Sequence, residues 1–192
     1  LFRSVMSIAI IDYGAGNLFS VQQAFKRLGY ESVLTCSEQV IRSANHVIFP
    51  GVGHAKSAME QLRKTGLDRV IPTLEQPVLG ICLGMQLMCG WNEEGQLDGL
   101  HIFQTDVRKI NPQEGYPVPH MGWNDVQIEG KTQAYYFVHS YAAEISPETW
   151  GIAAYPEVFS AALRKNNFLG VQFHPEKSGF AGEQLLTQFL AL

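Results

Sequence analysis

The first half of the chain alternates between short apolar runs and longer amphipathic stretches. Four apolar runs are expected to be strands, over residues 7–12, 32–34, 46–50 and 78–81. Runs without alternating polar positions are typical of strands buried on both faces, as in a parallel sheet. Apolar residues at helical spacing predict the intervening helices, over residues 17–28, 37–41, 55–64, 68–74 and 82–88. This succession of strands and helices predicts a doubly wound α/β sheet.

The second half of the chain is richer in strand-like segments. Six of them follow Gly95, over residues 103–110, 123–128, 135–141, 150–155, 158–164 and 169–173. Turn signals such as Asn-Pro and Glu-Gly separate them, and residues 182–190 read as a closing helix. We therefore expect a single-domain α/β fold with a doubly wound, mixed, mostly parallel sheet. Helices should cover both of its faces, and a β-rich antiparallel extension should continue it.

The length of 192 residues suits one domain with a sizeable core. We expect this domain over residues 7–192, after a leader over residues 1–6 in which Met6 is a candidate start. The leader is too short for a signal peptide. No apolar run is long enough to span a bilayer, and a formal net charge of -4 argues against a nucleic-acid or anionic membrane surface.

The three cysteines are too few and too scattered to indicate a disulfide framework. Cys36, Cys82 and Cys89 form an odd set, which favours free thiols in a reducing compartment and hence a cytoplasmic location. No Cys-x-x-Cys pair occurs, so we expect no structural zinc site. Cys89 is interpreted as a small buried residue, and the reactivity of Cys36 and Cys89 stays open.

A cysteine stands between two glycines where the strand over residues 78–81 passes into a helix. The spacing Gly80-x-Cys82-x-Gly84 is the thiol counterpart of the Gly-x-Ser-x-Gly turn that presents a nucleophile. So sharp a turn strains the backbone, and the residues two positions either side must lack a side chain. The sulfur then lies at a helix N-terminus, which favours the thiolate. We expect Cys82 to be a nucleophile; the alternative is a buried cysteine beside two turn glycines.

A histidine and a glutamate near the C-terminus could serve that cysteine. His174 ends the strand expected over residues 169–173, and Glu176 follows two positions later. Pro175 should hold this segment extended, so that Glu176 reaches His174 and fixes its tautomer. The order of residues predicts a thiol triad of Cys82, His174 and Glu176. The alternative is a strand-end histidine with an incidental acidic neighbour.

Backbone N–H groups are expected to stabilise a negative oxygen at this thiol. One belongs to Leu83, the residue after the nucleophile. The other should come from Gly51-Val52-Gly53, which follows the strand over residues 46–50. Glycines let a peptide turn its N–H toward a site, although this loop could also be an ordinary strand-to-helix turn. The predicted oxyanion hole is formed by Gly51, Val52 and Leu83.

Four motifs resemble those of the class I, or triad, glutamine amidotransferases, and they occur in the same order. They are Pro50-Gly51-Val52-Gly53, Gly80-Ile81-Cys82-Leu83-Gly84-Met85-Gln86, Tyr136-Phe137-Val138-His139-Ser140-Tyr141 and Gln172-Phe173-His174-Pro175-Glu176-Lys177-Ser178. Two further segments, Ile11-Asp12-Tyr13-Gly14-Ala15-Gly16-Asn17 and Pro119-His120-Met121-Gly122-Trp123-Asn124, are similar to those of the glutaminase subunits of histidine biosynthesis. The resemblance extends from Ser7 to the C-terminus.

The resemblance implies a reaction and the residues that perform it. The family hydrolyses the side-chain amide of L-glutamine to L-glutamate and ammonia, through a γ-glutamyl thioester on the cysteine. The substrate-binding residues that it implies are Gly53, Gln86, His139, Ser140 and Tyr141. It implies no cofactor and no metal. Gln86 as a helix-surface residue and His139 as a packed strand residue stay open as alternatives.

The ammonia has to be used elsewhere, because a glutaminase of this size has no room for a synthase. Free ammonia takes up a proton in water and loses its nucleophilicity, so a second chain should receive it nearby. The resemblance implies that this partner is a (β/α)8-barrel cyclase subunit in a heterodimer. It implies an interface with Asn17, Trp123, Tyr136 and Lys177. Trp123 in the core and Lys177 as a solvated charge are the alternatives.

Other functions stay open on the sequence alone. The chain could be the glutaminase of another class I enzyme, of the anthranilate synthase or pyridoxal phosphate synthase type. It could also be a thiol peptidase, a γ-glutamyl hydrolase or a catalytically silent interaction subunit. We expect low activity of the isolated chain, because an oxyanion loop that aligns only with the partner bound would prevent waste of glutamine.

Overall fold

The computed structural model describes residues 6–14 and 17–192. The expected leader, apart from Met6, and two residues of the opening motif, Ala15 and Gly16, therefore lie outside it. The helices are α1 (Leu18–Arg27), α2 (Glu38–Ser43), α3 (Ala55–Thr65), α4 (Leu67–Val70), α5 (Leu83–Leu87) and α6 (Gly179–Leu190), with 3-10 turns η1 (Ile71–Thr73) and η2 (Pro175–Lys177). The strands are β1 (Ile8–Ile11), β2 (Ser32–Thr35), β3 (His46–Gly51), β4 (Val78–Cys82), β5 (Trp91–Asn92), β6 (Leu97–Asp98), β7 (Asp106–Lys109), β8 (His120–Ile128), β9 (Lys131–His139), β10 (Tyr141–Ala143), β11 (Thr149–Ala154), β12 (Val158–Lys165) and β13 (Phe168–Val171).

The core of the sheet is parallel, in the order β2-β1-β3-β4-β13. β2 lies at the edge, and the other four strands, β1, β3, β4 and β13, are buried at every position. Alternate residues of β1 face different cores, with Ala9 and Ile11 on one side and Ile8 and Ile10 on the other. Burial on both faces explains the continuous apolar runs of the sequence.

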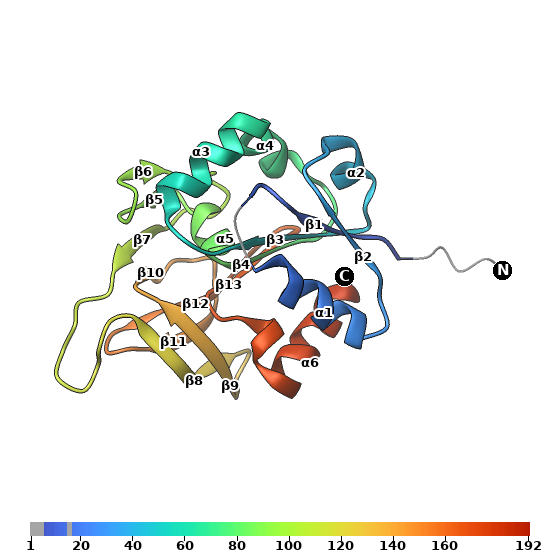
Figure 1. Ribbon diagram of the computed structural model, residues 1–192. Coiled ribbons are helices and arrows are strands. Elements are labelled where there is room, and N and C mark those ends of the chain that lie inside the picture. Colours follow the sequence, from blue (N-terminus) through green and yellow to red (C-terminus); the bar gives the residue numbers. More distant parts are fainter. Residues whose placement is uncertain (1–5, 15–16) are drawn as a thin grey trace.

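Helices cover both faces of the parallel core. α1 and α6 pack on one face, whereas α3, α4 and α5 pack on the other (Figure 1). Asn17 accepts a hydrogen bond from the N–H of Ser20 at the start of α1, and Gly66 ends α3 with a φ of 75°, both of which are typical of helix ends. The doubly wound arrangement predicted from the sequence is confirmed.

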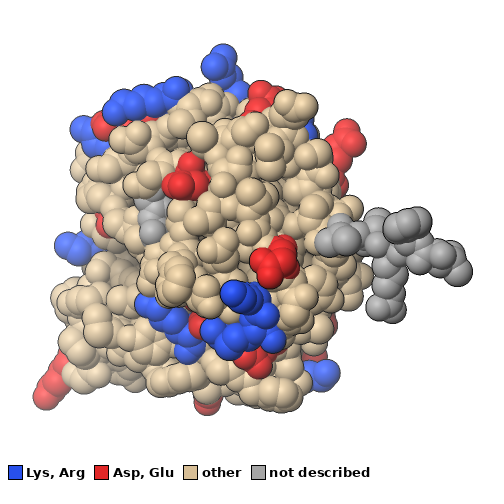
Figure 2. Space-filling model, turned by 45° about the vertical axis from the view of Figure 1, so that its right-hand side comes forward, with Lys and Arg blue, Asp and Glu red and all other residues tan. Residues whose placement is uncertain are grey.

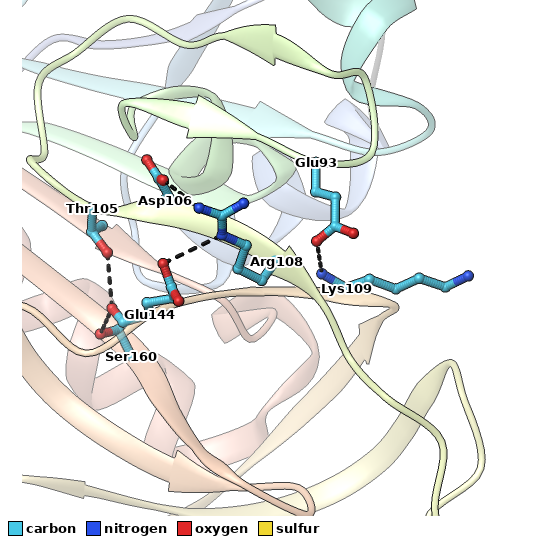
Figure 3. Close-up of polar contacts among 7 residues, drawn as sticks. All are labelled: Glu93, Thr105, Asp106, Arg108, Lys109, Glu144 and Ser160. Atoms are coloured by element: carbon cyan, nitrogen blue, oxygen red, sulfur yellow. Dashed lines mark hydrogen bonds and ion pairs between the residues drawn. The ribbon is translucent and has the colours of Figure 1, made fainter.

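The β-rich extension joins the parallel core through β12, which pairs antiparallel with β13. β10 and β7 continue the sheet, while β11, β8 and β9 branch from β12. The hydroxyls of Thr105 and Ser160 both donate to the carbonyl oxygen of Glu144, at 2.9 and 2.7 Å (Figure 3). Arg108 pairs with the carboxylates of Asp106 and Glu144 on the exposed side, where each ion pair contributes about 1 kcal/mol or less.

Several boundaries differ from those expected. The helix predicted over residues 68–74 is α4 followed by the 3-10 turn η1, because Pro72 lacks the N–H that an α-helix needs. The strand predicted over residues 135–141 is divided at Ser140, where the chain leaves β8 and pairs with β7. β5 and β6 were not predicted, since two residues are too few to show a period.

The surface carries few charges, in keeping with the charged fraction of 17%. The face in Figure 2 is mainly uncharged, and its basic side chains gather beside acidic ones. Within the described residues, no helix has the length and apolar character needed to cross a membrane.

His46, at the start of β3, is a buried polar side chain without hydrogen bonds in the described part of the chain. Only 5% of it is exposed, and neither ring nitrogen has a partner. Its ring packs edge-on against Phe189, with centroids 5.2 Å apart. Burial lowers the pKa of His46 from its ordinary value, so the folded protein holds this ring neutral.

We expect His46→Leu to reduce the sensitivity of the fold to acid. Unfolded histidine takes up a proton near pH ~6.5, whereas folded His46 resists it, so acidification below that pH favours the unfolded wild type. Leucine removes this contribution, and the free energy of unfolding should fall less between about pH 7 and pH 5. Urea unfolding at a series of pH values measures the difference. His101→Asn, at an exposed histidine, is the control, and an equal loss in His46→Leu and wild type would contradict the expectation.

Candidate active site

Cys82 ends β4 in a backbone conformation that few side chains adopt. Its φ is 54° and its ψ is -112°, which costs about 1–3 kcal/mol. A Cβ on Gly84 would collide with the carbonyl oxygen of Phe49, and one on Gly80 would lie 2.9 Å from the backbone nitrogen of Met85. The expected strained turn, with its need for two glycines, is confirmed.

The parallel register brings three strand ends together at this turn. Gly51 of β3 lies opposite Cys82, and Val171 of β13 lies opposite Ile81. A cavity of about 290 Å³ opens at this edge of the sheet. Predicted site residues make up most of its lining, which consists of Val52, Gly53, Cys82, Leu83, Gln86, Glu94, Pro119, Val138, His139, Ser140, Tyr141 and His174.

His174 and Glu176 form a buried pair beside the sulfur. Nδ1 of His174 lies 2.7 Å from Oε1 of Glu176, and the two side chains are 5% and 3% exposed. Because a carboxylate accepts, Nδ1 carries the hydrogen and Nε2 is the nitrogen available as a base. Burial alone would lower the pKa of His174, but the Cys82 sulfur and the Glu176 carboxylate together raise it to about 10. His174 is therefore suited to hold a proton taken from the thiol.

Pro175 positions Glu176 in a different way from the one expected. An extended segment was predicted, but Pro175–Lys177 form the 3-10 turn η2. Proline fits the first position of a helical turn because it needs no N–H partner there and its φ suits the turn. The turn brings Glu176 back to His174. The predicted contact between the two side chains is therefore present, whereas the extended backbone predicted to produce it is wrong.

The sulfur of Cys82 lies among three groups. Its thiol donates to the carbonyl oxygen of Val138 at 3.9 Å, and its sulfur accepts from Nε2 of Gln172 at 3.7 Å. Nε2 of His174 has no hydrogen-bond partner among the described residues, although it lies close enough for the sulfur to raise its pKa. Catalytic hydrogen bonds are often long or poorly aligned in a free enzyme and shorten when the substrate binds.

The predicted oxyanion residues lie at the same cavity. Val52 and Leu83 line it, and Gly51 packs so tightly that a Cβ on it would lie 2.7 Å from the backbone nitrogen of Gly84. Gly53 has a φ of 94°, a conformation that favours glycine. The structure brings these residues together, and their stabilisation of an oxyanion stays a prediction.

Tyr13 holds this loop and was missed by the sequence reasoning. It is buried after β1, and its hydroxyl donates to the carbonyl oxygen of Pro50 at 3.1 Å. Its ring packs against Phe49 with centroids 5.6 Å apart. Burial, with a smaller effect of the nearby Cys82, raises the pKa of Tyr13 well above its ordinary value. The hydroxyl therefore stays protonated and can continue to donate.

Gln86 lines the cavity with its side chain already engaged by the protein. Its Nε2 donates to the carbonyl oxygen of Tyr141 at 2.8 Å and to Oε1 of Gln172 at 2.9 Å. Only its amide oxygen could therefore accept from a ligand. The helix-surface alternative for Gln86 is wrong, because the residue is 5% exposed.

His139 also lines the cavity, and both of its ring nitrogens have protein partners. Nδ1 donates to the carbonyl oxygen of Tyr141 at 2.8 Å, so Nε2 must accept from Nδ1 of His120, at 3.0 Å. Burial is the main cause that lowers the pKa of His139 to about 3 and that of His120 to about 4. Both rings are neutral. His139 could therefore contact a substrate only through the face or edge of its ring or through its backbone groups.

Glu94 contributes a carboxylate to the cavity that the sequence reasoning missed. Its Oε2 accepts a hydrogen bond from the N–H of Ala55 at the start of α3, at 2.7 Å. The segment after β5 carries no periodic signal, so the sequence offered no reason to select it. This carboxylate is suited to bind a positively charged group of a ligand.

Three of the predicted interface residues lie together near the cavity. Trp123 is 59% exposed and packs edge-on against Tyr136, with centroids 6.1 Å apart. The ammonium of Lys177 lies 5.9 Å from the centre of the Tyr136 ring. The core alternative for Trp123 is therefore wrong. Met121 of the same strand as Trp123 is 62% exposed and was not among the predicted interface residues. Asn17, the fourth predicted interface residue, caps α1.

A larger hollow of about 380 Å³ lies beside β7 and β10, away from the thiol. Arg108 in its wall already pairs with two carboxylates, and the backbone N–H of Lys109 donates to Glu93 at 2.9 Å (Figure 3). The reactive groups lie at the smaller cavity. In residues 6–14 and 17–192, no three His, Cys, Asp or Glu side chains cluster closely enough to hold a metal.

Comparison with known proteins identifies relatives over nearly the whole chain. The sequence pattern of the family described as glutamine amidotransferase class-I matches residues 9–191. The imidazole glycerol phosphate synthase subunit HisH of Bacteroides fragilis strain YCH46 is 50% identical over 97% of this chain and 100% of the relative. The HisH subunit of Salmonella typhimurium strain LT2 is 45% identical, over 97% and 100%.

Solved structures show the same fold at low identity. A Thermoplasma acidophilum protein described as part of a GMP synthase matches with a TM-score of 0.74 and 15% identity, over 97% of this chain and 93% of that one. A structure described as a glutamine amidotransferase matches with a TM-score of 0.77 and 16% identity, over 95% and 97%. These likenesses concern the fold alone.

We expect Glu176→Gln to lower the pKa of His174. Glutamine keeps an oxygen near Nδ1 but removes one of the charges that hold the proton, so the ring should deprotonate ~1–3 pH units lower. An NMR titration of the His174 ring measures this shift. Glu183→Gln, which removes an exposed carboxylate paired with Arg27, is the matched control. An unchanged His174 titration in Glu176→Gln would contradict the pairing.

Proposed function

The chain belongs to the class I glutamine amidotransferase family, and we propose that it is the glutaminase subunit of an imidazole glycerol phosphate synthase. The buried pair of His174 and Glu176 beside the strained Cys82 is the observation that carries the proposal. This arrangement supports hydrolysis of L-glutamine to L-glutamate and ammonia. The HisH relatives, which are 45–50% identical over their full length, support the choice of synthase.

The first half of the reaction transfers the glutamyl group to sulfur. The thiol proton of Cys82 moves to Nε2 of His174, and the sulfur attacks the side-chain amide carbon of glutamine. The N–H groups of Leu83 and of the Gly51-Val52 peptide stabilise the negative oxygen, by ~3–4 kcal/mol for each donor. His174 then gives its proton to the leaving nitrogen, the C–N bond breaks, and ammonia departs from a thioester.

The second half releases glutamate. His174 takes a proton from water, the oxygen attacks the thioester, and the C–S bond breaks. The proton on His174 returns to the sulfur, so the site regains its starting state. Glu176 keeps Nδ1 protonated and stabilises the imidazolium in both halves, which matches its 2.7 Å contact.

Charge complementarity supports an orientation for glutamine in the cavity. The carboxylate of Glu94 would pair with the α-ammonium, and the amide oxygen of Gln86 could accept a second hydrogen from it. Gly53, Ser140 and Tyr141 line the space for the rest of the amino acid. His139 would shape the wall, since both of its ring nitrogens bind protein atoms.

The surface made by Trp123, Tyr136 and Lys177 is the proposed docking site for the cyclase subunit. Asn17, which caps α1, is proposed to contact the same partner. An exposed tryptophan that packs on a half-buried tyrosine beside a cation is suited to be an interface anchor. Tyr136 and Val138 belong to the same strand, β9, and the carbonyl oxygen of Val138 accepts from the Cys82 thiol. Docking on this surface would therefore act on the sulfur through a single strand.

The partner is proposed to be a (β/α)8-barrel that uses the ammonia at once. It would convert a phosphoribulosyl formimino intermediate to imidazole glycerol phosphate and an aminoimidazole carboxamide ribotide, in histidine biosynthesis. A cytoplasmic location fits the exposed free thiol of Cys36, which would persist in a reducing compartment.

We expect glutaminase turnover to rise at least ~10-fold when the cyclase chain and its nucleotide ligand are added. In the chain alone the Cys82 thiol donates to Val138 and has no hydrogen bond to His174, so the resting site is poorly aligned. Release of glutamate from glutamine, measured with and without the partner, tests this.

Cys82→Ala is the control for that assay. It should bind the cyclase as the wild type does and release no glutamate under either condition. Full turnover by the purified chain alone would contradict the partner dependence. A chorismate-using partner would contradict the assigned synthase.

We expect Glu94→Gln to raise the KM for glutamine by about ten- to a hundredfold, with a smaller effect on kcat. A charged hydrogen bond to the α-ammonium is lost, whereas the bond from the Ala55 N–H can persist. Steady-state kinetics with glutamine and with its analogue lacking the α-amino group measure the difference.

Two comparisons show whether the rise in KM comes from the lost contact with the α-ammonium. The analogue should react equally with wild type and Glu94→Gln, since it has no ammonium to bind. Glu93→Gln is the matched control, because Glu93 also accepts a backbone N–H but lies at the other hollow. Equal losses on glutamine and on the analogue would contradict the assigned contact.

A further inference from the structure

Gln172 is a fully buried polar side chain in contact with the reacting sulfur. It follows β13 and is 0% exposed. Nε2 of Gln172 donates to Sγ of Cys82 at 3.7 Å, and its Oε1 accepts from Nε2 of Gln86 at 2.9 Å. Burying an amide costs free energy unless both of its ends are paired. One of the two partners here is the atom that forms the thioester.

The hydrogen-bond network determines which end of the Gln172 amide faces the sulfur. A carbonyl oxygen only accepts, so the group of Gln86 that contacts the carbonyl of Tyr141 at 2.8 Å must be its NH₂. The same NH₂ contacts Gln172, which must therefore present its oxygen to Gln86. The NH₂ of Gln172 is left facing Cys82, and a rotated amide would place two oxygens or two donors in contact.

An N–H aimed at sulfur favours the charged form of the nucleophile. A hydrogen bond to an ionised acceptor is stronger than one to the neutral group, so this donor stabilises a thiolate more than a thiol. The other groups at the sulfur act differently, since His174 takes the proton and the carbonyl of Val138 accepts from the thiol. Tyr13 also lies near the sulfur, and its raised pKa keeps it neutral.

We propose that Gln172 is a further catalytic residue of this site, whose NH₂ stabilises and orients the Cys82 thiolate, and that Gln86 is the positioning residue that holds the Gln172 amide in place. The assignment rests on Cys82 being the nucleophile of the proposed function. It adds a side-chain donor to the sulfur, whereas the predicted backbone donors stabilise the substrate oxygen. Gln172 also lies two positions before His174 along the chain, directly after β13.

The test measures alkylation of Cys82 by iodoacetamide against pH in the purified chain, without glutamine or partner. The variant Gln172→Met keeps the length of the side chain and removes the donor. A Cys36→Ser background excludes the exposed thiol, and peptide mass spectrometry confirms that Cys82 reacts. The midpoint of the rate profile should rise by about one pH unit, a tenfold loss of thiolate below it. Gln127→Met, at an exposed glutamine, should leave the midpoint where it is in the wild type.

A purely structural role would slow alkylation at every pH without moving the midpoint, and that result would overturn the proposal. Gln86→Met provides a second readout if Gln172→Met does not fold. It leaves Gln172 in place but frees its amide to turn, so a smaller rise in the midpoint is expected and no rise would overturn the proposal. Alkylation needs no glutamine. A shifted midpoint in a chain that fails to hydrolyse glutamine would therefore contradict the proposed glutaminase function and leave the proposed role of Gln172 intact. An unshifted midpoint in an active glutaminase would reject the role of Gln172 alone.

Discussion

The strained backbone at Cys82 is the constraint on which the rest of the structure depends. A positive φ at a residue with a side chain persists only where the surroundings over-determine it. Here β3 and β13 hold β4 on both sides, and Gly84 fits against the carbonyl of Phe49 with no room for a methyl group. Relaxation of this turn would move the sulfur out of the cavity, so the packing of the parallel core is also what presents the nucleophile.

Electrostatics at the site depends on which histidines stay neutral. Burial lowers the pKa of His120 and His139, and their mutual hydrogen bond gives each a defined tautomer. His174 is as buried, but the sulfur and the Glu176 carboxylate raise its pKa to about 10. The three rings lie near one another, and only His174 is suited to carry the transferred proton. The neutral pair therefore adds no positive charge that would compete with it.

Short sequence patterns predicted the features that depend only on residues close together in the chain. The buried strands follow from the apolar runs, and the strained turn at Cys82 follows from the two glycines that flank it. The pairing of His174 with Glu176 was predicted from spacing, although a 3-10 turn and not an extended strand produces it. Glu94 was missed because it lies in a segment without a pattern of its own. Tyr13 and Gln172 lie within two of the motifs, but their contacts with Pro50 and with Cys82 come from the tertiary arrangement and not from a local pattern.

The central claim is that Cys82 carries the glutamyl group between the two halves of the reaction. The direct measurement is the mass of the Cys82 peptide after an acid quench of the assembled enzyme during turnover of glutamine. A peptide carrying one glutamyl group, absent before glutamine is added, is the predicted result. Continuing release of glutamate with the Cys82 peptide unmodified at every time of quench would contradict the account.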